Sequence, residues 1–293
     1  MQDIARQDFP AGALYVVATP IGNIADISLR ALTLLSMADA VACEDTRNTG
    51  HLLTRYGLHS KLIAAHQHNE REVADRLIER LHAGARIALV SDAGTPAVSD
   101  PGARIVDAVR NAGLRVIPLP GASAGTAALS ASGLLAAQFH FIGFLPTKAA
   151  QRDTILRGLR GVAAALVFYE APHRICDTVA ALQAVFEPTR QVVFARELTK
   201  LFEEIHRCAL SDAAAWLAAG KHRQKGEYVV IVDAAPTAAD HDTVEADRVL
   251  TILLAHCPLR QAAMLAAQIT GLKKNALYDR ALQLQDDAPR QDP

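Results

Sequence analysis

Residues 91–102, Ser-Asp-Ala-Gly-Thr-Pro-Ala-Val-Ser-Asp-Pro-Gly, join a predicted strand to a predicted helix. The apolar run at 86–90 before them is typical of a buried parallel strand. After them, Ile105, Val106 and Val109 share one face of a helix. The stretch is therefore a loop at the carboxyl end of a strand, which is where open α/β sheets bind their ligands.

The composition of this loop suits either a ligand site or a well-capped turn. Its two glycines let the backbone approach a ligand closely, and its two prolines stiffen it. Asp92 and Asp100 supply hydrogen-bond acceptors. We expect Asp100 to cap the following helix, with Pro101 at the first helical position.

The overall composition indicates an ordinary globular chain. Of its 293 residues, 51% are hydrophobic and 21% are charged, and the net charge is -1. A nucleic-acid partner would therefore have to be bound by local basic patches. The four cysteines are far apart, which signals neither a zinc cage nor a disulfide framework and favours the cytoplasm. Residues 1–10 are not a signal peptide, and no apolar run is long enough to span a membrane.

Two α/β lobes are predicted by the order of apolar runs and helical patterns. In the first lobe five apolar runs alternate with helices, which favours a mainly parallel sheet; they lie at 13–18, 40–43, 61–65, 86–90 and 115–118. In the second lobe some strands follow one another directly, which favours a mixed sheet; they lie at 139–144, 165–169, 191–195, 204–210 and 227–233.

We predict three parts for the chain: an N-terminal α/β lobe at 12–135, a C-terminal α/β lobe at 136–234 and a helical segment at 245–285. Residues 234–243 are rich in Ala, Pro and Asp and are typical of a linker. The spacing of apolar residues in the helical segment predicts three short helices, as in a helix-turn-helix.

Several familiar site motifs are absent. No phosphate-binding Gly-x-x-x-x-Gly-Lys-Ser/Thr loop, dinucleotide-binding Gly-x-Gly-x-x-Gly or Gly-x-Ser-x-Gly elbow occurs. His66 and His68 could bind a metal, but this spacing at a strand end is more typical of a solvated turn, and no metal site is predicted. The strand-end loops offer small residues, Asp92, Ser123 and Tyr169, which suit a zwitterionic ligand with an adenine and a ribose.

Eight ordered motifs resemble those of the tetrapyrrole methylase superfamily. They lie at 18–23, 44–47, 91–102, 118–123, 141–146, 169–174, 196–200 and 225–230. The resemblance covers about residues 12 to 285. Within the superfamily, the chain is most similar to the branch that methylates a cytidine ribose 2′-hydroxyl in the decoding region of 16S rRNA. The resemblance thus implies S-adenosylmethionine as the methyl donor, 16S rRNA in the small ribosomal subunit as the partner and a homodimer as the assembly.

The resemblance also implies where the donor binds, in a cleft between the two lobes. The matching positions are Pro20, Gly22, Asp92, Gly94, Thr95, Ser123, Ala124 and Tyr169. The chain departs from the family in one place: many relatives acting on small molecules have Gly-Asp-Pro where this chain has Ser91-Asp92-Ala93.

Methyl transfer to a hydroxyl is an in-line displacement that needs alignment and an acceptor for the hydroxyl proton. The acidic and basic candidates at strand ends are Glu44, Asp45, Glu170, Glu197 and Lys200. Our first choice is Lys200, with Glu197 and Glu44 as further catalytic candidates. Burial beside Arg196 would lower the pKa of Lys200 and leave it partly neutral. Alternatively, Arg196, Glu197 and Lys200 form an ion-pair network that only holds the loop.

Local basic groups are candidates for RNA binding. Arg47 and Arg174, on strand-end loops, suit bidentate phosphate binding. Lys148 lies on a basic helix at 148–160, and Arg223 in a basic loop at 221–225. Two rival functions are a porphyrinoid methyltransferase and a non-enzymatic RNA-binding protein. The helical segment and the loop arginines argue against the first, and the cofactor loops argue against the second.

Overall fold

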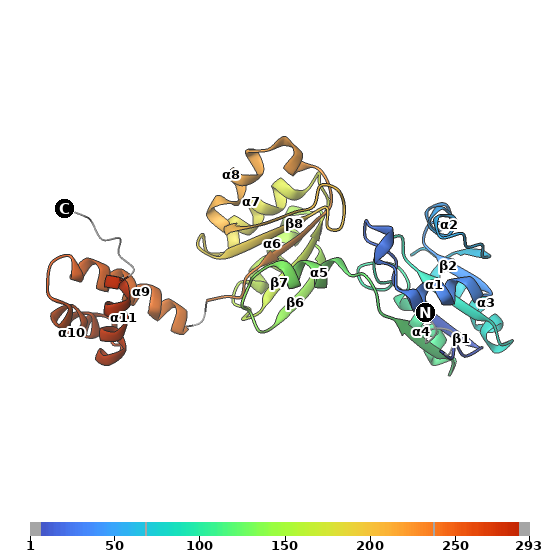
Figure 1. The fold of residues 1–293 in the computed structure, drawn as a ribbon, viewed down its shortest axis with the longest axis horizontal. Coiled ribbons are helices and arrows are strands. Elements are labelled where there is room, and N and C mark those ends of the chain that lie inside the picture. Colours follow the sequence, from blue (N-terminus) through green and yellow to red (C-terminus); the bar gives the residue numbers. More distant parts are fainter. Residues whose placement is uncertain (1–6, 68, 237, 287–293) are drawn as a thin grey trace. The chain divides into compact units, whose positions relative to one another are not determined.

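The computed structural model describes residues 7–67, 69–236 and 238–286. They divide into two compact units, the first within Met1–Arg160 and Ala164–Asp233 and the second within Gly161–Ala163 and Ala234–Pro293. The first unit contains two five-stranded sheets, and the second contains the helices at the carboxyl end (Figure 1). The two α/β lobes and the helical segment predicted from the sequence are therefore confirmed as the fold.

The first sheet is entirely parallel, as predicted, with the order β3-β2-β4-β1-β5. Its strands are β1 (Ala13–Val17), β2 (Ala40–Cys43), β3 (Leu62–Ala64), β4 (Arg86–Val90) and β5 (Arg115–Leu119). The helices between them are η1 (Ile24–Asp26), α1 (Leu29–Met37), α2 (Thr46–Arg55), α3 (Glu70–His82) and α4 (Ala103–Asn111).

Both faces of this sheet are covered, because its strands carry apolar residues at nearly every position. On one face, Tyr15 of β1 packs with Leu34 of α1, and on the other Leu14 packs with Ile105 of α4. The neighbouring strands β1 and β4 are thus followed by helices on opposite faces. This divergence is the topological switch point at which α/β sheets open a crevice for ligands.

The second sheet is mixed, as predicted, with the order β6-β7-β10-β8-β9. Its strands are β6 (Phe139–Phe144), β7 (Ala165–Glu170), β8 (Gln191–Arg196), β9 (Glu204–Ala209) and β10 (Tyr228–Val232). Only β6 and β7 pair in parallel, and the other neighbours are antiparallel. The accompanying helices are α5 (Ala124–Ala131), α6 (Ala149–Leu159), α7 (Ile175–Val185), η2 (Leu210–Asp212), α8 (Ala213–Ala218) and η3 (Lys221–Gln224).

The predicted cap of α4 is wrong. The helix begins at Ala103 with Gly102 as its N-cap at φ 125°, and no side chain caps it from within the loop. Instead, the buried carboxylate of Glu70, at the start of α3, accepts a hydrogen bond of 2.6 Å from the Gly102 N–H. Because Glu70 accepts the hydrogen bond from the Gly102 N–H, Asp100 does not cap α4.

The second unit is built from α9 (Ala238–Leu254), α10 (Leu259–Thr270) and α11 (Lys274–Asp286). Leu250, Ala266 and Leu277 meet in its core, and Arg280 of α11 pairs with Asp247 of α9 at 2.7 Å. The linker prediction for 234–243 is wrong from residue 238 onward, and Thr237 lies outside the described residues. Neither proline nor glycine occurs between 237 and 257, so the helix propagates. In the described ranges, no helix is both long and apolar enough to cross a bilayer.

Candidate active site

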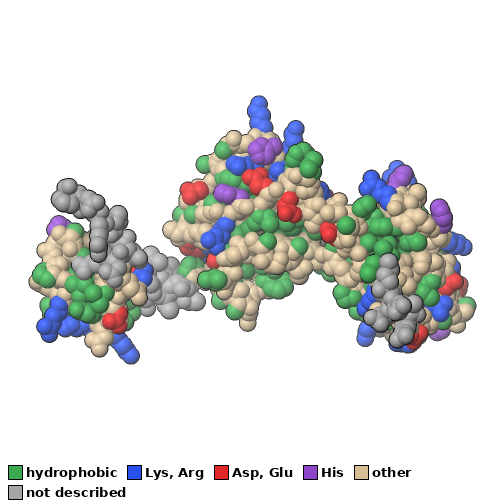
Figure 2. All heavy atoms as spheres, in the orientation of Figure 1, with side chains coloured by type: hydrophobic (Ala, Val, Ile, Leu, Met, Phe, Trp, Pro, Cys, Tyr) green, Lys and Arg blue, Asp and Glu red, His purple; other side chains and the backbone are tan. Residues whose placement is uncertain are grey.

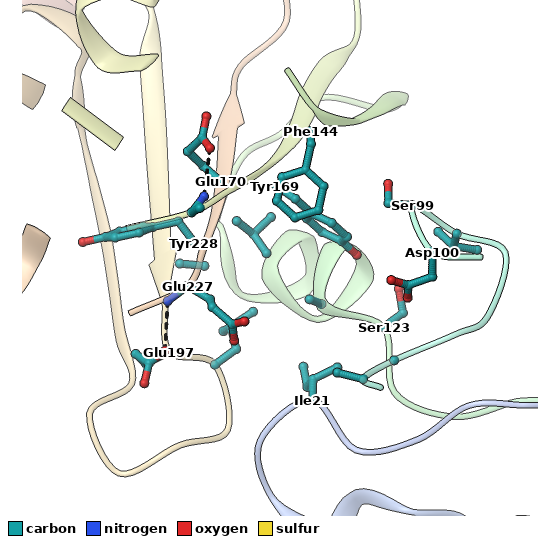
Figure 3. A pocket seen from close by; sticks show the side chains of 18 of the residues that line it. Ile21, Ser99, Asp100, Ser123, Phe144, Tyr169, Glu170, Glu197, Glu227 and Tyr228 are labelled. Carbon is teal, nitrogen blue, oxygen red and sulfur yellow. Dashed lines mark hydrogen bonds between the residues drawn. The ribbon is translucent and has the colours of Figure 1, made fainter. Parts of the chain in front are cut away.

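Loops from both sheets line one cavity in the first unit (Figure 3). The space between these loops, counted together with the open solvent at its mouth, is about 1010 Å³. The first sheet contributes Ile21 after β1 and the loop after β4, whereas the second contributes the ends of β7 and β8 and the start of β10. The polar and aromatic side chains that line it include Asp100, Ser123, Phe144, Tyr169, Glu197, Lys200 and Glu227.

The 91–102 loop is fixed to its neighbours by short hydrogen bonds. Thr19 and Gly94 exchange both backbone N–H···O bonds, at 2.8 and 3.0 Å. The Thr19 hydroxyl donates to the Ser91 carbonyl at 3.1 Å, and the Thr95 hydroxyl donates to the Ala122 carbonyl at 3.1 Å. The loops after β1, β4 and β5 therefore form one connected floor under the cavity.

Both cavity loops contain strained backbone. In the described part of the chain, the non-glycine residues with positive φ are Ala97 (66°), Ser99 (62°), Glu197 (50°) and Thr199 (66°). Such conformations cost roughly 1–3 kcal/mol each and persist where the surrounding structure imposes them, often at functional sites. Among the residues that the structure describes, these positions lie on the loop after β4 and the loop after β8, which face the cavity from different sheets.

Tyr169 forms the aromatic wall of the cavity. Its hydroxyl accepts a hydrogen bond of 3.1 Å from the Gly125 N–H at the start of α5. Its ring meets Phe141 edge-on at 5.0 Å and Phe144 at 5.7 Å between centroids. Burial raises the pKa of Tyr169, so the hydroxyl stays neutral at physiological pH. Ser123 and Ala124, beside this hydroxyl, also line the cavity.

Lys200 is held by two glutamates. Its Nζ donates to Glu197 Oε1 at 2.8 Å and to Glu227 Oε2 at 2.7 Å. Burial disfavours the charged ammonium, but the hydrogen bonds to both carboxylates outweigh it and raise the pKa of Lys200 above its ordinary value. The expectation of a partly neutral Lys200 is therefore wrong. Arg196 is not among the groups that shift the pKa of Lys200. Its guanidinium donates to the Phe202 carbonyl and lies 3.5 Å from Glu204.

Asp100 is a cavity carboxylate with a raised pKa. Burial raises its pKa to about 6, and the charges of Glu44 and Asp92 add to the rise, against a hydrogen bond with Ser91. Its side chain points into the cavity from the loop after β4, close to Ser123 in the view of Figure 3. The sequence reading treated Asp100 as a cap. No local sequence signal excludes Asp100 as the cap, because the acceptor that replaces it, Glu70, lies 32 residues before Gly102.

Comparisons with known proteins decide the family. The sequence profile of the Tetrapyrrole (Corrin/Porphyrin) Methylases matches residues 13–214, and that of the RsmI C-terminal HTH domain matches residues 240–285. Two proteins named ribosomal RNA small subunit methyltransferase I, from Pseudomonas aeruginosa and Escherichia coli O157:H7, are 49% and 46% identical to this chain. The matches cover 94% and 97% of this chain and 98% and 100% of theirs.

The chain belongs to the ribosomal RNA small subunit methyltransferase I family. It is therefore a methyltransferase. Among solved structures, the methyltransferase CobJ has a TM-score of 0.58 at 23% identity, over 78% of this chain and 96% of that one. Diphthine synthase also has a TM-score of 0.58, at 19% identity, over 77% of this chain and 90% of that one. These two structures establish the shared fold.

In this member of the family, five of the eight predicted cofactor positions line the cavity: Gly94, Thr95, Ser123, Ala124 and Tyr169. Pro20 is buried at the end of β1 and does not line it. The carboxylate of Asp92 accepts hydrogen bonds from the Asp45 N–H at 3.2 Å and from Asn48 Nδ2 at 2.7 Å. Asp92 thus holds the start of α2 in place, and its role as a cofactor ligand stays a prediction.

Gly22 lies against the second lobe rather than in the cavity lining. A Cβ placed on it would stand 2.5 Å from Lys200 Cγ, 2.9 Å from Thr199 Oγ1 and 3.1 Å from the Leu198 carbonyl oxygen. The turn after β1 can therefore approach the strained loop after β8 only because residue 22 has no side chain.

The remaining acid–base candidates differ in their surroundings. Glu44, at the end of β2, lies outside the cavity lining, and burial and the charges of Asp92 and Asp45 raise its pKa. Hydrogen bonds from Arg47 hold the pKa of Asp45 at about 2. Glu170 is only 2% exposed and accepts hydrogen bonds from Thr178 Oγ1 at 2.5 Å and the Ala171 N–H at 2.8 Å. Glu170 lines the cavity, but its carboxylate already has these two internal donors.

Glu197 and two of the predicted RNA-binding residues, Arg174 and Arg223, contact other residues of the same chain. Hydrogen bonds from Lys200 and the Glu227 N–H outweigh burial and lower the pKa of Glu197, which makes it a weak base. Arg174 is largely buried and donates to the Leu145 carbonyl at 2.6 Å. Arg223 stacks over Trp216 at 4.5 Å. These contacts argue against both arginines as phosphate clamps.

Arg47 and Lys148 are exposed, so both can still meet RNA. Arg47 pairs with Asp45 at 2.7 Å, but its side chain is 84% exposed, and such surface pairs contribute little to stability. No cluster of three potential metal ligands occurs among the described residues, and His68 lies outside them.

Proposed function

We propose that this protein transfers the methyl group of S-adenosylmethionine to the ribose 2′-hydroxyl of a cytidine in the decoding region of 16S rRNA. The single observation that carries this proposal is the cavity built from the strand-end loops of both lobes, in a chain of this family. In the reaction a carbon–sulfur bond breaks, a carbon–oxygen bond forms and the hydroxyl loses its proton. The small ribosomal subunit as substrate implies that the protein acts in the cytoplasm.

The residues of the cavity fit S-adenosylmethionine, which supplies a methyl group already activated on a sulfonium cation. Backbone groups at 93–95, the Ser123 hydroxyl and the Tyr169 ring suit an adenosine. The carboxylates of Asp100 and Glu227 suit the positive charges of the donor. Because the displacement needs no acid at the sulfur, the protein's own task is alignment and removal of the hydroxyl proton.

We assign Asp100 as the proton acceptor, because it lines the cavity and is more basic than an ordinary aspartate. A carboxylate with a pKa of about 6 is ionised at pH 7 to 8, yet it is more basic than an ordinary aspartate. Lys200 keeps its proton because of its two glutamates, so we assign it an electrostatic role in holding the loop after β8 and the start of β10 together.

The carboxyl-terminal unit is proposed to bind rRNA. Arg260, Lys273 and Lys274 are exposed at the starts of α10 and α11, which flank the turn of the helix-turn-helix. Figure 2 shows Lys and Arg side chains on the visible face of these helices. In a helix-turn-helix, residues at the start of the second helix meet the nucleic acid. A homodimer is part of the proposal, since Leu201 and Phe202 are 89% and 65% exposed and would gain from being covered by a second copy.

The proposed function is tested by incubating the purified protein with tritiated S-adenosylmethionine and small ribosomal subunits from a strain that lacks the enzyme. We expect label in one cytidine ribose, located by nuclease digestion and mass spectrometry. Parallel reactions contain naked 16S rRNA and a porphyrinogen. Label in the porphyrinogen alone would establish the rival small-molecule function, and RNA binding without label would establish the non-enzymatic one.

Lys200 variants separate its electrostatic role from a proton-acceptor role. We expect Lys200→Arg to keep most of the turnover rate, because a guanidinium can still neutralise Glu197 and Glu227. Lys200→Ala should lose about tenfold, which corresponds to roughly 1.4 kcal/mol of transition-state stabilisation. The measurement is single-turnover methylation of the small subunit. If Lys200→Arg folds but lowers the turnover rate as much as Lys200→Ala does, Lys200 is the proton acceptor.

A further inference from the structure

A bulge in β6 turns an aromatic side chain into the cavity. The pairing of β6 with β7 shifts by one residue between Phe141 and Gly143, and Gly143 has φ +73°. In a regular strand, residues three apart point to opposite faces. With the bulge, Phe141 and Phe144 both meet the ring of Tyr169, at 5.0 and 5.7 Å. Bulges of this kind redirect a side chain next to an active site.

The bulge lies against the other lobe. A Cβ on Gly143 would overlap the side chain of Ser99, so the bulge lies directly against the 91–102 loop. Ser99 has a positive φ of its own. A strained residue after β4 and a glycine bulge in β6 therefore lie against each other at this point, next to Phe144.

Phe144 presents an open aromatic surface to the cavity. It is 53% exposed although it lines the cavity and rests on Tyr169. In Figure 3 its ring lies beside that of Tyr169. Within the described residues, Tyr169 is its one aromatic neighbour. A large apolar ring held open at a ligand cavity suggests a flat ligand that covers it.

We propose that Phe144 stacks on the nucleobase of the acceptor cytidine and thereby holds the attached ribose at the cavity. This inference rests on the proposed function and adds the residue that positions the acceptor. Proteins that modify RNA nucleotides bind bases outside the helical stack by placing them on aromatic side chains. Asp100 lines the same cavity, so a ribose held in this way can present its 2′-hydroxyl to that carboxylate.

The same strand supplies a matched control. Phe139, at the other end of β6, is 55% exposed and does not line the cavity. Replacing Phe139 or Phe144 by alanine removes the same number of atoms from a comparably exposed site. A difference between the two variants therefore reports on the cavity and not on general loss of apolar surface.

The test measures kcat/KM for the small ribosomal subunit and, separately, the calorimetric Kd for S-adenosylmethionine. Base–aromatic stacking is typically worth a factor of about 5 to 150 in binding. We expect Phe144→Ala to lower kcat/KM by about 10- to 100-fold with an unchanged cofactor Kd. Phe144→Trp should retain activity, Phe144→Leu should behave like Ala, and Phe139→Ala should behave like the unmodified protein.

Three results would overturn the proposal. If Leu rescues as well as Trp, the residue is only an apolar wall. If the cofactor Kd rises in step with the loss of activity, Phe144 contacts the donor and not the acceptor. If Phe144→Ala keeps full kcat/KM, the ring has no part in acceptor binding. Failure of the proposed function itself looks different, because then the unmodified protein would not methylate the subunit either.

Discussion

Asp100→Asn should nearly abolish methyl transfer and at the same time stabilise the fold at pH 8. A positioned base contributes about 10²- to 10⁴-fold to the rate, and asparagine cannot accept the proton. The stabilisation follows because ionised Asp100 is partly buried and near the charges of Glu44 and Asp92. Loss of function accompanied by a gain in stability is characteristic of an active-site residue.

The pH dependence has a definite sign. The folded-state pKa of Asp100 is raised to about 6 from 3.8, so folding favours its protonated form. That contribution is fully present below pH 3.8 and is lost as the pH rises through 6. The Asn variant should therefore gain roughly 1–3 kcal/mol relative to the unmodified protein at pH 8, and almost nothing at pH 4. In the unmodified protein kcat/KM should fall as the pH drops below about 6.

Denaturant unfolding at both pH values, with single-turnover methylation, measures these effects. Asp107→Asn, an exposed substitution on α4, is the control and should change neither quantity. An Asp100→Asn variant that keeps its rate would remove Asp100 from the chemistry. One that is less stable at pH 8 would show that its charge is satisfied in the folded protein.

Gly22→Ala should lower both the stability of the fold and the activity. The new methyl group would stand 2.5 Å from Lys200 Cγ and 3.1 Å from the Leu198 backbone oxygen, and the backbone cannot rotate away as a flexible side chain can. We expect the loop after β8 to be displaced, at a cost of about 1–3 kcal/mol in stability, which is usual for overpacking. Because that loop carries Glu197 and Lys200, activity should fall by more than about tenfold.

Gly50→Ala is the matched control. Gly50 lies in α2, and a Cβ there would meet only Leu62 Cδ1 at 3.6 Å. Alanine at this position should stabilise the helix by up to about 1 kcal/mol and leave activity unchanged. Thermal unfolding and methylation of both variants measure the contrast. Equal behaviour of the two variants would mean that the turn after β1 tolerates a side chain and that the lobes do not need this close contact.

The fold was predictable from the sequence because its signals are local. Each strand of the first sheet is a short apolar run, and each is followed by a helix with one apolar face, so the parallel sheet follows from the alternation. The cavity loops were predictable for the same reason, since Gly94, Thr95 and Ser123 directly follow strand ends.

The electrostatics of the site were not predictable, because they depend on partners distant in the sequence. Glu227, which keeps Lys200 charged, lies 27 residues after it and reaches it only because β10 pairs with β8. Likewise, Asp100 is free to act in the cavity because Glu70, 32 residues before Gly102, takes the N–H at the start of α4. Charge and capping at this site are properties of the tertiary structure.

The position of β10 determines when during synthesis the cavity can form. The first sheet is complete once residue 119 has been made. Most of its consecutive strands are connected by a single helix. In the second sheet, the last strand in the sequence lies in the middle, between β7 and β8. Until residues 228–232 leave the ribosome, both neighbours expose unpaired edges that favour aggregation. We therefore expect nascent chains that end before residue 228 to contain a folded first sheet, no binding site for the methyl donor and a need for chaperones.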